Sequence, residues 1–319
     1  MSLTALVRGL FDYAGMYPPA SLSFEEALAK SAGFRKTLRR PGMVAGDLVC
    51  GVERLDSLDA AHLGRAGWDL ERPFKACALG PVLAGPGALA KEEQRAAAAR
   101  AVAFGAEGKP KRAAVSYEVK CPVSHLSDPK TAEALAAVRV GLGGYVGGLF
   151  LEPECPATEW PQAVETVFSV LSAMPEELRP ALKVRCSGPA AIDGESLARV
   201  IAGAVDRGWR LKATAGLHHP IKERRYDNRT GFLGLALAVR LRRALGPGFS
   251  TPLINGCLAA DDPGHFDFLD GGAAWLKFRL SAAQLEGRVG LTIGSCSLEE
   301  PDSDLARLFP KEADKIGVD

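Results

Sequence analysis

The stretch LKVRCSGPAAIDGESLARVIAGAVDRGWRLKATAG, residues 182–216, decides the fold class of this chain. It opens with a short apolar run, LKVRC, and after an amphipathic segment it reaches a second run, WRLKATA, at residues 209–215. Short apolar runs bounded by Gly, Pro or polar residues are typical of strands buried on both faces of a parallel sheet. The stretch therefore predicts a strand–helix–strand unit with parallel strands.

The segment between the two runs predicts a helix over residues 194–207. Asp193 is a good N-cap residue, and Gly208 is a good residue for the C-terminal end. The apolar residues between them recur at the spacing of one buried helix face: Leu197, Val200, Ile201, Ala204 and Val205. The same reasoning predicts helices over residues 231–245 and 92–105.

A further helix is expected near the start of the chain, because Ser23 and Glu26 form a capping box for a helix that reaches about residue 38. Similar apolar runs along the chain predict strands at 43–50, 73–80, 112–119, 145–152, 182–186, 209–215 and 289–295.

Strands that alternate with helices every roughly 30 residues favour a parallel α/β fold. This number of strands over this length favours a (β/α)8 TIM-type barrel, and no GxGxxG follows the first strand to suggest a dinucleotide fold. The remaining strand is expected between residues 246 and 285, where 250–258 and 273–280 compete. The latter also fits an extra hairpin near 265–280. We expect one barrel domain, 1–319, with an N-terminal helical extension at 1–40.

The composition of the chain is that of a globular protein. Its 319 residues are 47% hydrophobic and 24% charged, with a net charge of +1. Such a chain can bury a core and is not disordered. No basic stripe is present, which argues against a nucleic-acid partner. No apolar run approaches the roughly 18 residues that a membrane-spanning helix needs, so no membrane partner is expected.

The number and spacing of the cysteines indicate the redox environment of the protein. All seven are spread singly, with no CxxC motif. An odd number of scattered cysteines does not form a disulfide framework and favours a reducing, cytoplasmic location. Arg8 and Asp12 interrupt what would have to be the apolar core of a secretory signal, so no such signal is expected.

Polar residues gather where the predicted strands end, which in a barrel is the catalytic end. These residues are Glu118, Lys120, Glu152, Glu154, Arg185, Cys186, Ser187, Lys212, Thr214, His218, His219, Ser295, Cys296 and Ser297.

Lys212 is the most informative of them. Strand alternation puts Lys212 and Thr214 on one face and the apolar Leu211 and Ala213 on the other, so Lys212 points into the barrel. Burial disfavours the charged form of an amine, and a neutral lysine is the nucleophile of Schiff-base enzymes. The structural alternative is an ion pair of Lys212 with Glu152 or Glu118.

The first functional hypothesis is a class I aldolase or related lyase, which requires no cofactor. Lys212 forms an imine with a carbonyl substrate, Glu152 or His218 moves protons, and Thr214 hydrogen-bonds the substrate. The residues expected to bind the substrate are Arg185, His219, Ser295, Ser297 and Asp12. The expected partner is a small molecule, with a phosphate or carboxylate group as an option, and a homo-oligomer is compatible with the sequence.

The second hypothesis is a metal-dependent hydrolase or isomerase. Cys186, His218 or His219, and Glu152, with Cys296 as a further option, would hold zinc or another divalent metal, and Lys212 would stabilise a developing oxyanion. His218 and His219 are adjacent, so their side chains diverge and at most one is expected to bind a given ion. The third hypothesis is a small-molecule binding barrel without catalysis.

The stretch IGSCSLEEPDSDLARL, residues 293–308, leads from a strand into a helix. Barrels often bind phosphate at such a helix N-terminus. The alternative is that Glu299, Glu300 and Asp302 simply complement the helix dipole.

Two resemblances come from these motifs. The pattern K-x-T-x-G at residues 212–216 resembles the deoxyribose-phosphate aldolase group, whose Schiff-base lysine lies in a similar strand setting. The longer motifs LKATAGLHHP, GFLG (231–234), IGSCSLEEP and FDYAGMYPPAS (11–21) resemble a family of uncharacterised bacterial proteins. The second resemblance spans most of the chain and implies that LKATAGLHHP, IGSCSLEEP and FDYAGMYPPAS belong to one site. It implies no particular reaction.

Overall fold

The computed structural model describes residues 2–71, 74–102, 112–143, 148–223, 230–269, 271–286 and 290–313. One sheet has the strand order β2-β1-β12-β8-β7-β6-β5-β4-β3, and a second has the order β11-β10-β9. The strands are β1 (Phe11–Tyr13), β2 (Val44–Gly46), β3 (Leu48–Gly51), β4 (Phe74–Leu79), β5 (Arg112–Pro122), β6 (Gly148–Glu154), β7 (Ala181–Arg185), β8 (Leu211–Thr214), β9 (Phe266–Leu269), β10 (Gly272–Trp275), β11 (Phe278–Ser281) and β12 (Leu291–Ser295).

Helices follow most strands of the larger sheet. They are α1 (Ser2–Val7), α2 (Phe24–Thr37), α3 (Val52–Ser57), α4 (Ala60–Arg65), α5 (Lys91–Val102), α6 (Pro129–Leu142), α7 (Trp160–Ala173), α8 (Gly194–Asp206), α9 (Phe232–Leu245), α10 (Thr251–Leu258), α11 (Ala282–Leu285), α12 (Glu299–Leu308) and α13 (Pro310–Ala313). The strand pairs β3–β4, β4–β5, β5–β6, β6–β7 and β8–β12 are all parallel. The predicted fold class, α/β of the (β/α)8 TIM type, is confirmed.

The chain forms two compact units. The first unit consists of Met1–Phe11, Arg35–Ala45 and Val184–Asp319, and the second consists of Asp12–Phe34 and Gly46–Lys183. We describe each unit by itself. The expectation of one domain over 1–319 with a helical extension at 1–40 stays a prediction.

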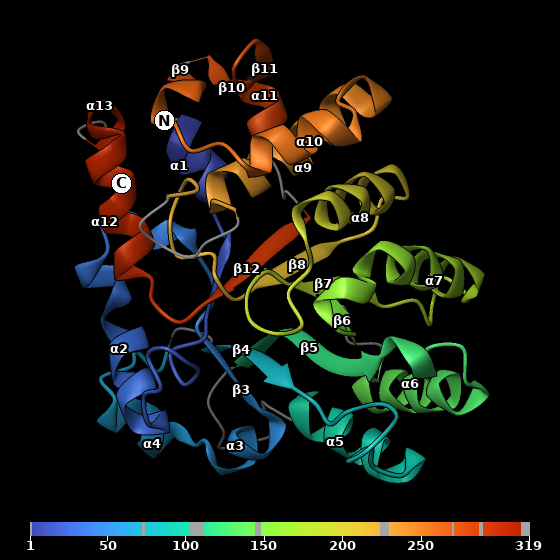
Figure 1. The fold of residues 1–319 in the computed structure, drawn as a ribbon. Coiled ribbons are helices and arrows are strands. Elements are labelled where there is room, and N and C mark those ends of the chain that lie inside the picture. The colour runs from blue at the N-terminus through green and yellow to red at the C-terminus, as the bar shows by residue number, and fades with distance from the viewer. Residues whose placement is uncertain are drawn as a thin grey trace. The chain divides into compact units, whose positions relative to one another are not determined.

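The second unit is built around β3, β4, β5 and β6, with α5 packed along α6 (Figure 1). On β5 the buried apolar residues Tyr117 and Val119 alternate with Glu118 and Lys120. The register pairs Lys120 with Glu152 of β6, so charged residues of two neighbouring strands share one face of the sheet.

The first unit contains β8 and β12, with α8, α9 and α10 packed against one another (Figure 1). Helix α8 begins as its sequence predicts, because the Asp193 carboxylate accepts a hydrogen bond from the Ser196 N–H at 2.8 Å. The predicted helix over 231–245 is observed as α9.

Two predicted elements near the start of the chain have different outcomes. The Ser23–Glu26 capping box is present at the start of α2, with hydrogen bonds of 2.8 and 3.2 Å. The single strand predicted over 43–50 is wrong, because it is divided into β2 and β3 at Asp47. The Asp47 carboxylate accepts from the Lys75 N–H at 2.8 Å and its N–H donates to the Lys75 carbonyl at 2.7 Å, so this residue interrupts the run.

The strand expected between 246 and 285 is not part of the larger sheet. Residues 251–258 of the first candidate form α10, with Ser250 as the N-cap and a proline at the second helical position. The extra hairpin expected near 265–280 is confirmed as the antiparallel sheet β9-β10-β11. The larger sheet instead gains β1 at Phe11–Tyr13, inside the expected helical extension. Three buried residues are too short for a periodic signal.

The ends of four predicted elements, at residues 73, 103–105, 145–147 and 289, lie outside the described residues. In the described part of the chain, no helix has both the length and the apolar character to span a membrane.

Candidate functional site

The candidate site lies in the first unit, where the segment after β8 meets the turn between β12 and α12. The segment after β8 begins with two residues in the left-handed region, Ala215 at φ 63° and Gly216 at φ 72°. A Cβ atom on Gly216 would lie 2.7 Å from Ser187 Cβ, so this segment passes directly against the residues that follow β7. The backbone therefore needs glycine here, for its conformation and for its close approach. We call residues 215–223 the histidine loop.

His218 is the half-buried member of the histidine pair. Its Nδ1 atom lies 3.5 Å from the Ser295 hydroxyl, and its Nδ1 and Nε2 atoms lie 3.7 and 3.8 Å from the Cys296 sulfur. Nearly equal distances to both nitrogens mean that the thiol is aligned with neither lone pair. Burial lowers the pKa of His218, the Glu300 carboxylate raises it in part, and His219 lowers it further. His218 is thus a neutral imidazole beside a thiol and a hydroxyl at neutral pH.

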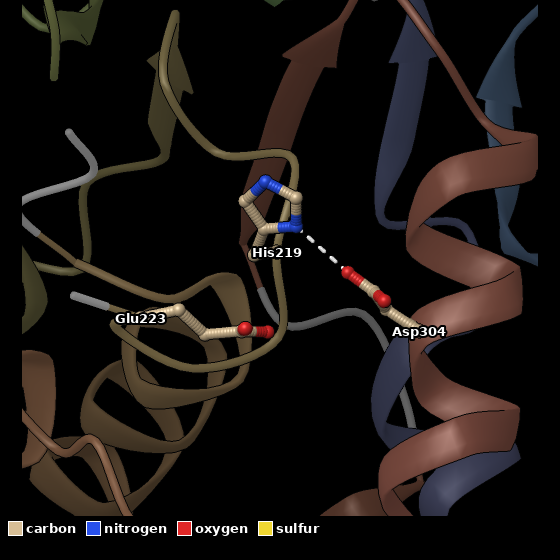
Figure 2. Close-up of side chains that lie close together, drawn as sticks. All are labelled: His219, Glu223 and Asp304. Carbon is tan, nitrogen blue, oxygen red and sulfur yellow. Dashed lines mark hydrogen bonds and ion pairs between the residues drawn. The ribbon is translucent and has the colours of Figure 1, made fainter. Parts of the chain in front are cut away.

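His219 is more deeply buried and has a different partner. Its Nδ1 atom lies 2.7 Å from Asp304 Oδ2 on α12 (Figure 2). Its Nε2 atom lies 3.8 Å from Glu300 Oε1. The two imidazole rings are 6.5 Å apart between centroids and inclined by 65°. The expected divergence of the two histidines is confirmed, because each ring has its own set of contacts.

Asp304 connects His219 to the protein surface. Arg307 Nη2 lies 2.9 Å from Asp304 Oδ1 and 2.9 Å from Glu223 Oε1, so one guanidinium spans two carboxylates. Burial by itself would raise the pKa of Asp304, but hydrogen bonds from His219 and Arg307 outweigh it and lower that pKa. Asp304 is therefore a carboxylate that accepts hydrogen bonds from both sides.

Lys212 and Thr214 lie on β8, ahead of the histidine loop. Lys212 is 1% exposed, between the buried Leu211 and Ala213. In the register with β12, Thr214 faces Gly294, where a Cβ atom would lie 2.9 Å from the threonine hydroxyl. The strand thus carries a buried lysine, as alternation predicts, and a glycine on the neighbouring strand leaves room for the Thr214 hydroxyl.

Ser295 and Ser297 shape the turn after β12. The Ser295 hydroxyl donates to the Ser297 carbonyl at 2.6 Å, and the Ser297 hydroxyl accepts from the Glu300 N–H at 3.3 Å. In this geometry both hydroxyls are engaged in closing the turn and starting α12. Their expected contact with a substrate stays a prediction.

The acidic first turn of α12 has a structural partner. Asp302 accepts from Arg40 Nη1 at 2.9 Å and from the Arg39 N–H at 2.6 Å, and the Arg40–Asp302 pair is buried. This carboxylate anchors the helix start, which agrees with the structural alternative for this segment. The expected phosphate site at this helix N-terminus has no further support.

Arg185 and Cys186 lie at the end of β7. The Cys186 N–H donates to the Thr214 carbonyl at 2.8 Å, which ties the strand end to β8. Burial raises the pKa of the Cys186 thiol to about 12, although nearby Arg185 lowers it slightly. Of the predicted metal ligands Cys186, Cys296 and His218, the structure brings Cys296 and His218 close together, and Cys186 remains a buried, protonated thiol.

A second polar cluster lies in the second unit. The ammonium group of Lys183 on β7 lies 2.8 Å from Glu118 Oε2 and 2.7 Å from Glu152 Oε2, and all three side chains are buried. The Ser116 hydroxyl donates to Glu118 Oε1 at 2.9 Å. Two anions at these distances favour the charged form of Lys183.

Lys183 was not among the residues predicted for the site, although the run LKVR alternates apolar Leu182 and Val184 with charged Lys183 and Arg185. The alternation of apolar and charged residues that predicted the burial of Lys212 on β8 was therefore also present on β7. Glu223, Asp304 and Arg307 were also absent from the predicted site residues. Only the i,i+3 spacing of Asp304 and Arg307 could be recognised in the sequence. The contact of Asp304 with His219 spans 85 residues, and that of Arg307 with Glu223 spans 84.

Asp12 belongs to the second unit and is fully buried. Its Oδ1 atom and the Cys77 sulfur lie where a Cβ atom on Gly46 would be, at 2.6 and 2.5 Å. Tyr17 lies nearby in sequence, and its pKa is raised by burial first, and then by the charges of Cys50, Glu53 and Glu118. The expected substrate contact of Asp12 stays a prediction.

No protein-family model matches this chain, and no curated protein matches it. The chemistry of the site is therefore inferred from the arrangement of its residues. Of the three motifs predicted to form one site, LKATAGLHHP and IGSCSLEEP lie together in the first unit. Together they supply a buried lysine, a neutral histidine, a thiol and a histidine–carboxylate pair. Residues 12–21 of the third motif, FDYAGMYPPAS, belong to the second unit, and their expected part in the site stays a prediction.

Proposed function

We propose that this chain is an enzyme of the lyase class, similar to an aldolase, that acts on a small carbonyl compound through an imine on Lys212. One observation carries the proposal: a lysine that is 1% exposed lies on β8 and leads directly into a loop whose His218 contacts Cys296 and Ser295. Buried lysines are rare in proteins, and burial favours the neutral amine that attacks a carbonyl carbon.

The chemical step uses the chain's own groups. The Lys212 amine adds to the carbonyl carbon, and the carbonyl oxygen leaves as water, so that a C=N bond replaces the C=O bond. The protonated imine then accepts the electron pair of the Cα–Cβ bond as that bond breaks, which releases an aldehyde and leaves an enamine on Lys212; protonation of the enamine carbon and hydrolysis of the imine by water release the second product and restore the amine. His218 takes a proton from the substrate hydroxyl in this step and returns it in the reverse direction. Thr214, two residues from Lys212, hydrogen-bonds the substrate.

Lys183 and Glu152 have a different task in this proposal. Glu152 was the other residue predicted to transfer protons, but its carboxylate lies 2.7 Å from the Lys183 ammonium. An ammonium held between two carboxylates stays protonated and is not a nucleophile. We assign the imine to Lys212, which leads into the loop that carries His218, and the proton transfer to His218, and leave Glu152 as a partner of Lys183.

Borohydride trapping tests the proposal directly. The full chain is incubated with a panel of small aldehydes and ketones, reduced with borohydride, and analysed by intact mass and peptide mapping. We expect a saturable single adduct on the peptide that contains Lys212. Lys212→Arg abolishes the adduct, whereas Lys183→Arg, which keeps a cation between its two carboxylates, retains it. Trapping only on exposed lysines across the panel, or on Lys183, would overturn the proposal.

The metal-dependent hydrolase or isomerase predicted from Cys186, Cys296 and His218 has less support. Among the residues that the structure describes, Cys186, Cys296 and His218 do not form a group of three donors close enough to share one ion. The binding barrel without catalysis predicts a ligand-dependent rise in melting temperature with no adduct and no turnover. The trapping experiment separates it from the lyase.

A further inference from the structure

His219, Glu223 and Asp304 form a three-donor cluster that the proposed lyase chemistry does not use. One ligand atom from each of the three residues lies within 4.8 Å of the others. His219 and Glu223 come from the histidine loop, and Asp304 comes from α12 (Figure 2). One imidazole nitrogen and two carboxylate oxygens are a donor set that zinc and similar divalent ions bind in proteins.

The guanidinium group of Arg307 contacts both carboxylates of the cluster. The side chains of Glu223 and Asp304 are 13% and 14% exposed, whereas Arg307, which contacts both, is 46% exposed. The guanidinium is thus the outermost member and approaches two mostly buried carboxylates from the solvent side. Because an exposed arginine can rotate into water at little cost, a cation that binds both carboxylates more strongly can replace it.

The protonation of His219 also fits a bound ion. The Nδ1 atom lies 2.7 Å from Asp304 Oδ2, so a neutral ring donates its Nδ1 proton to that carboxylate. An ion bound at Nδ1 requires the proton to move to Nε2. Nε2 lies 3.8 Å from Glu300 Oε1, and Glu300 is half exposed and able to adjust. A metal-bound histidine whose other nitrogen donates to a carboxylate is the usual arrangement in zinc sites.

We propose that His219, Glu223 and Asp304 bind one divalent transition-metal ion, with Zn²⁺ as the first candidate, in exchange for Arg307, and that Glu300 accepts the Nε2 proton of His219. Zinc–ligand distances of about 2.0–2.2 Å require the Nδ1 to Oδ2 distance to widen to about 3.3 Å. Water fills the remaining coordination position.

The ion would join two segments that are far apart in the sequence. It links the histidine loop, which also carries His218, to α12, 85 residues away. An ion that binds the folded chain and not the unfolded chain raises the melting temperature, and the rise grows with the logarithm of the ion concentration above Kd. The inference does not depend on Lys212, because none of its ligands takes part in imine formation.

Metal binding by the full chain is the test. The protein is treated with a chelator, dialysed, and titrated with ZnSO₄, MnCl₂ or MgCl₂, with calorimetry for affinity and elemental analysis for stoichiometry. We expect one Zn²⁺ per chain, weaker Mn²⁺ binding, and no comparable Mg²⁺ binding, since Mg²⁺ prefers oxygen ligands. We also expect a higher melting temperature with Zn²⁺.

The variants separate a metal site from a purely structural network. His219→Ala and Asp304→Asn lose the single-equivalent binding, and Glu300→Gln weakens it by roughly 10–100-fold. Arg307→Ala tightens zinc binding, because it removes the competing cation. The matched control is His62→Ala, since His62 and Asp59 form a histidine–aspartate pair of 2.8 Å that belongs to no three-donor group among the described residues. This control leaves binding unchanged.

Three results would overturn the inference. They are no saturable zinc binding by the wild-type chain, zinc binding that survives both His219→Ala and Asp304→Asn, and zinc binding that is weakened by Arg307→Ala. Loss of binding in Cys296→Ser with retention in His219→Ala would also overturn it, in favour of Cys296 and His218. Failure of the metal titration leaves borohydride trapping on Lys212 unaffected, so the two proposals fail separately.

Discussion

The ammonium group of Lys183 lies 2.7 Å from the carboxylate of Glu152, and both side chains are at most 7% exposed. Glu118 lies at 2.8 Å from the same ammonium. One buried ammonium group therefore contacts two buried carboxylates inside the second unit. A buried charge is tolerated only when it is paired, so the three residues depend on one another.

We predict that Lys183→Met destabilises the protein by roughly 3–5 kcal/mol, because it leaves two buried carboxylates without their shared cation. The matched control is Lys120→Met, which removes the pair of Lys120 with Glu154 at 2.8 Å. Those side chains are 40% and 34% exposed, so the control costs at most about 1 kcal/mol. Urea unfolding measures both values. Equal costs for the two variants would contradict the prediction.

The start of the histidine loop provides a second prediction. Gly216→Ala forces a left-handed alanine and brings its Cβ to 2.7 Å from Ser187 Cβ. Gly208→Ala also forces a left-handed alanine, at φ 70°, but nothing lies within 4 Å of its Cβ. We expect Gly208→Ala to cost about 1–2 kcal/mol and Gly216→Ala to cost at least about 1 kcal/mol more. Thermal unfolding of the pair measures the difference, and its absence would show that Ser187 moves freely.

The N-cap of α8 leads to a prediction about pH. Burial by itself raises the pKa of Asp193, but hydrogen bonds from Ser196 and from backbone N–H groups outweigh it and lower that pKa. A lowered folded-state pKa adds stability above the unfolded-state value of about 3.9, and this stability is lost as the pH falls through the folded-state pKa. Asp193→Ala therefore costs about 1 kcal/mol at pH 7 and less in acid.

Asp193→Asn is the control for this prediction, because asparagine keeps the cap without a titrating group. Denaturant unfolding between neutral and strongly acidic pH measures both variants against the wild type. A cost of Asp193→Ala that does not change with pH would contradict the role of the ionised carboxylate.

Cys186 allows a chemical test of the site. With a pKa of about 12, its thiolate fraction at pH 8 is on the order of a thousandfold below that of a free cysteine. We expect no alkylation of Cys186 by iodoacetamide in the native protein and full alkylation after unfolding, as measured by peptide mapping. Rapid native alkylation would show a reactive thiolate and would return Cys186 to the set of metal ligands.

The sequence carries the information for elements whose signals are local. Helix α8 followed from Asp193 and from one apolar face, and the burial of Lys212 followed from the alternation on its strand. Such signals depend only on the chain's own periodicity and capping chemistry, so they are readable from neighbouring residues. The short strand β1 was not readable, since three residues carry no period.

The contacts between the site residues could not be predicted from the sequence. That His218 and His219 lie on a loop is readable from Gly216 and Pro220, but the ring contacts are not. Cys296 meets His218 across 78 residues, and Asp304 meets His219 across 85. Contacts between residues so far apart depend on how β12 and α12 pack beside β8, and no local pattern encodes that packing.

The sequence by itself therefore determined the α/β barrel class, helix α8 with its N-cap, and the place of Lys212 on a buried strand. Only the tertiary structure decided which charges meet: Lys183 with Glu118 and Glu152, and Asp304 with His219 and Arg307. The physical reason is that periodicity and capping act over a few residues, whereas the pairing of buried charges depends on which distant strands and helices become neighbours in space.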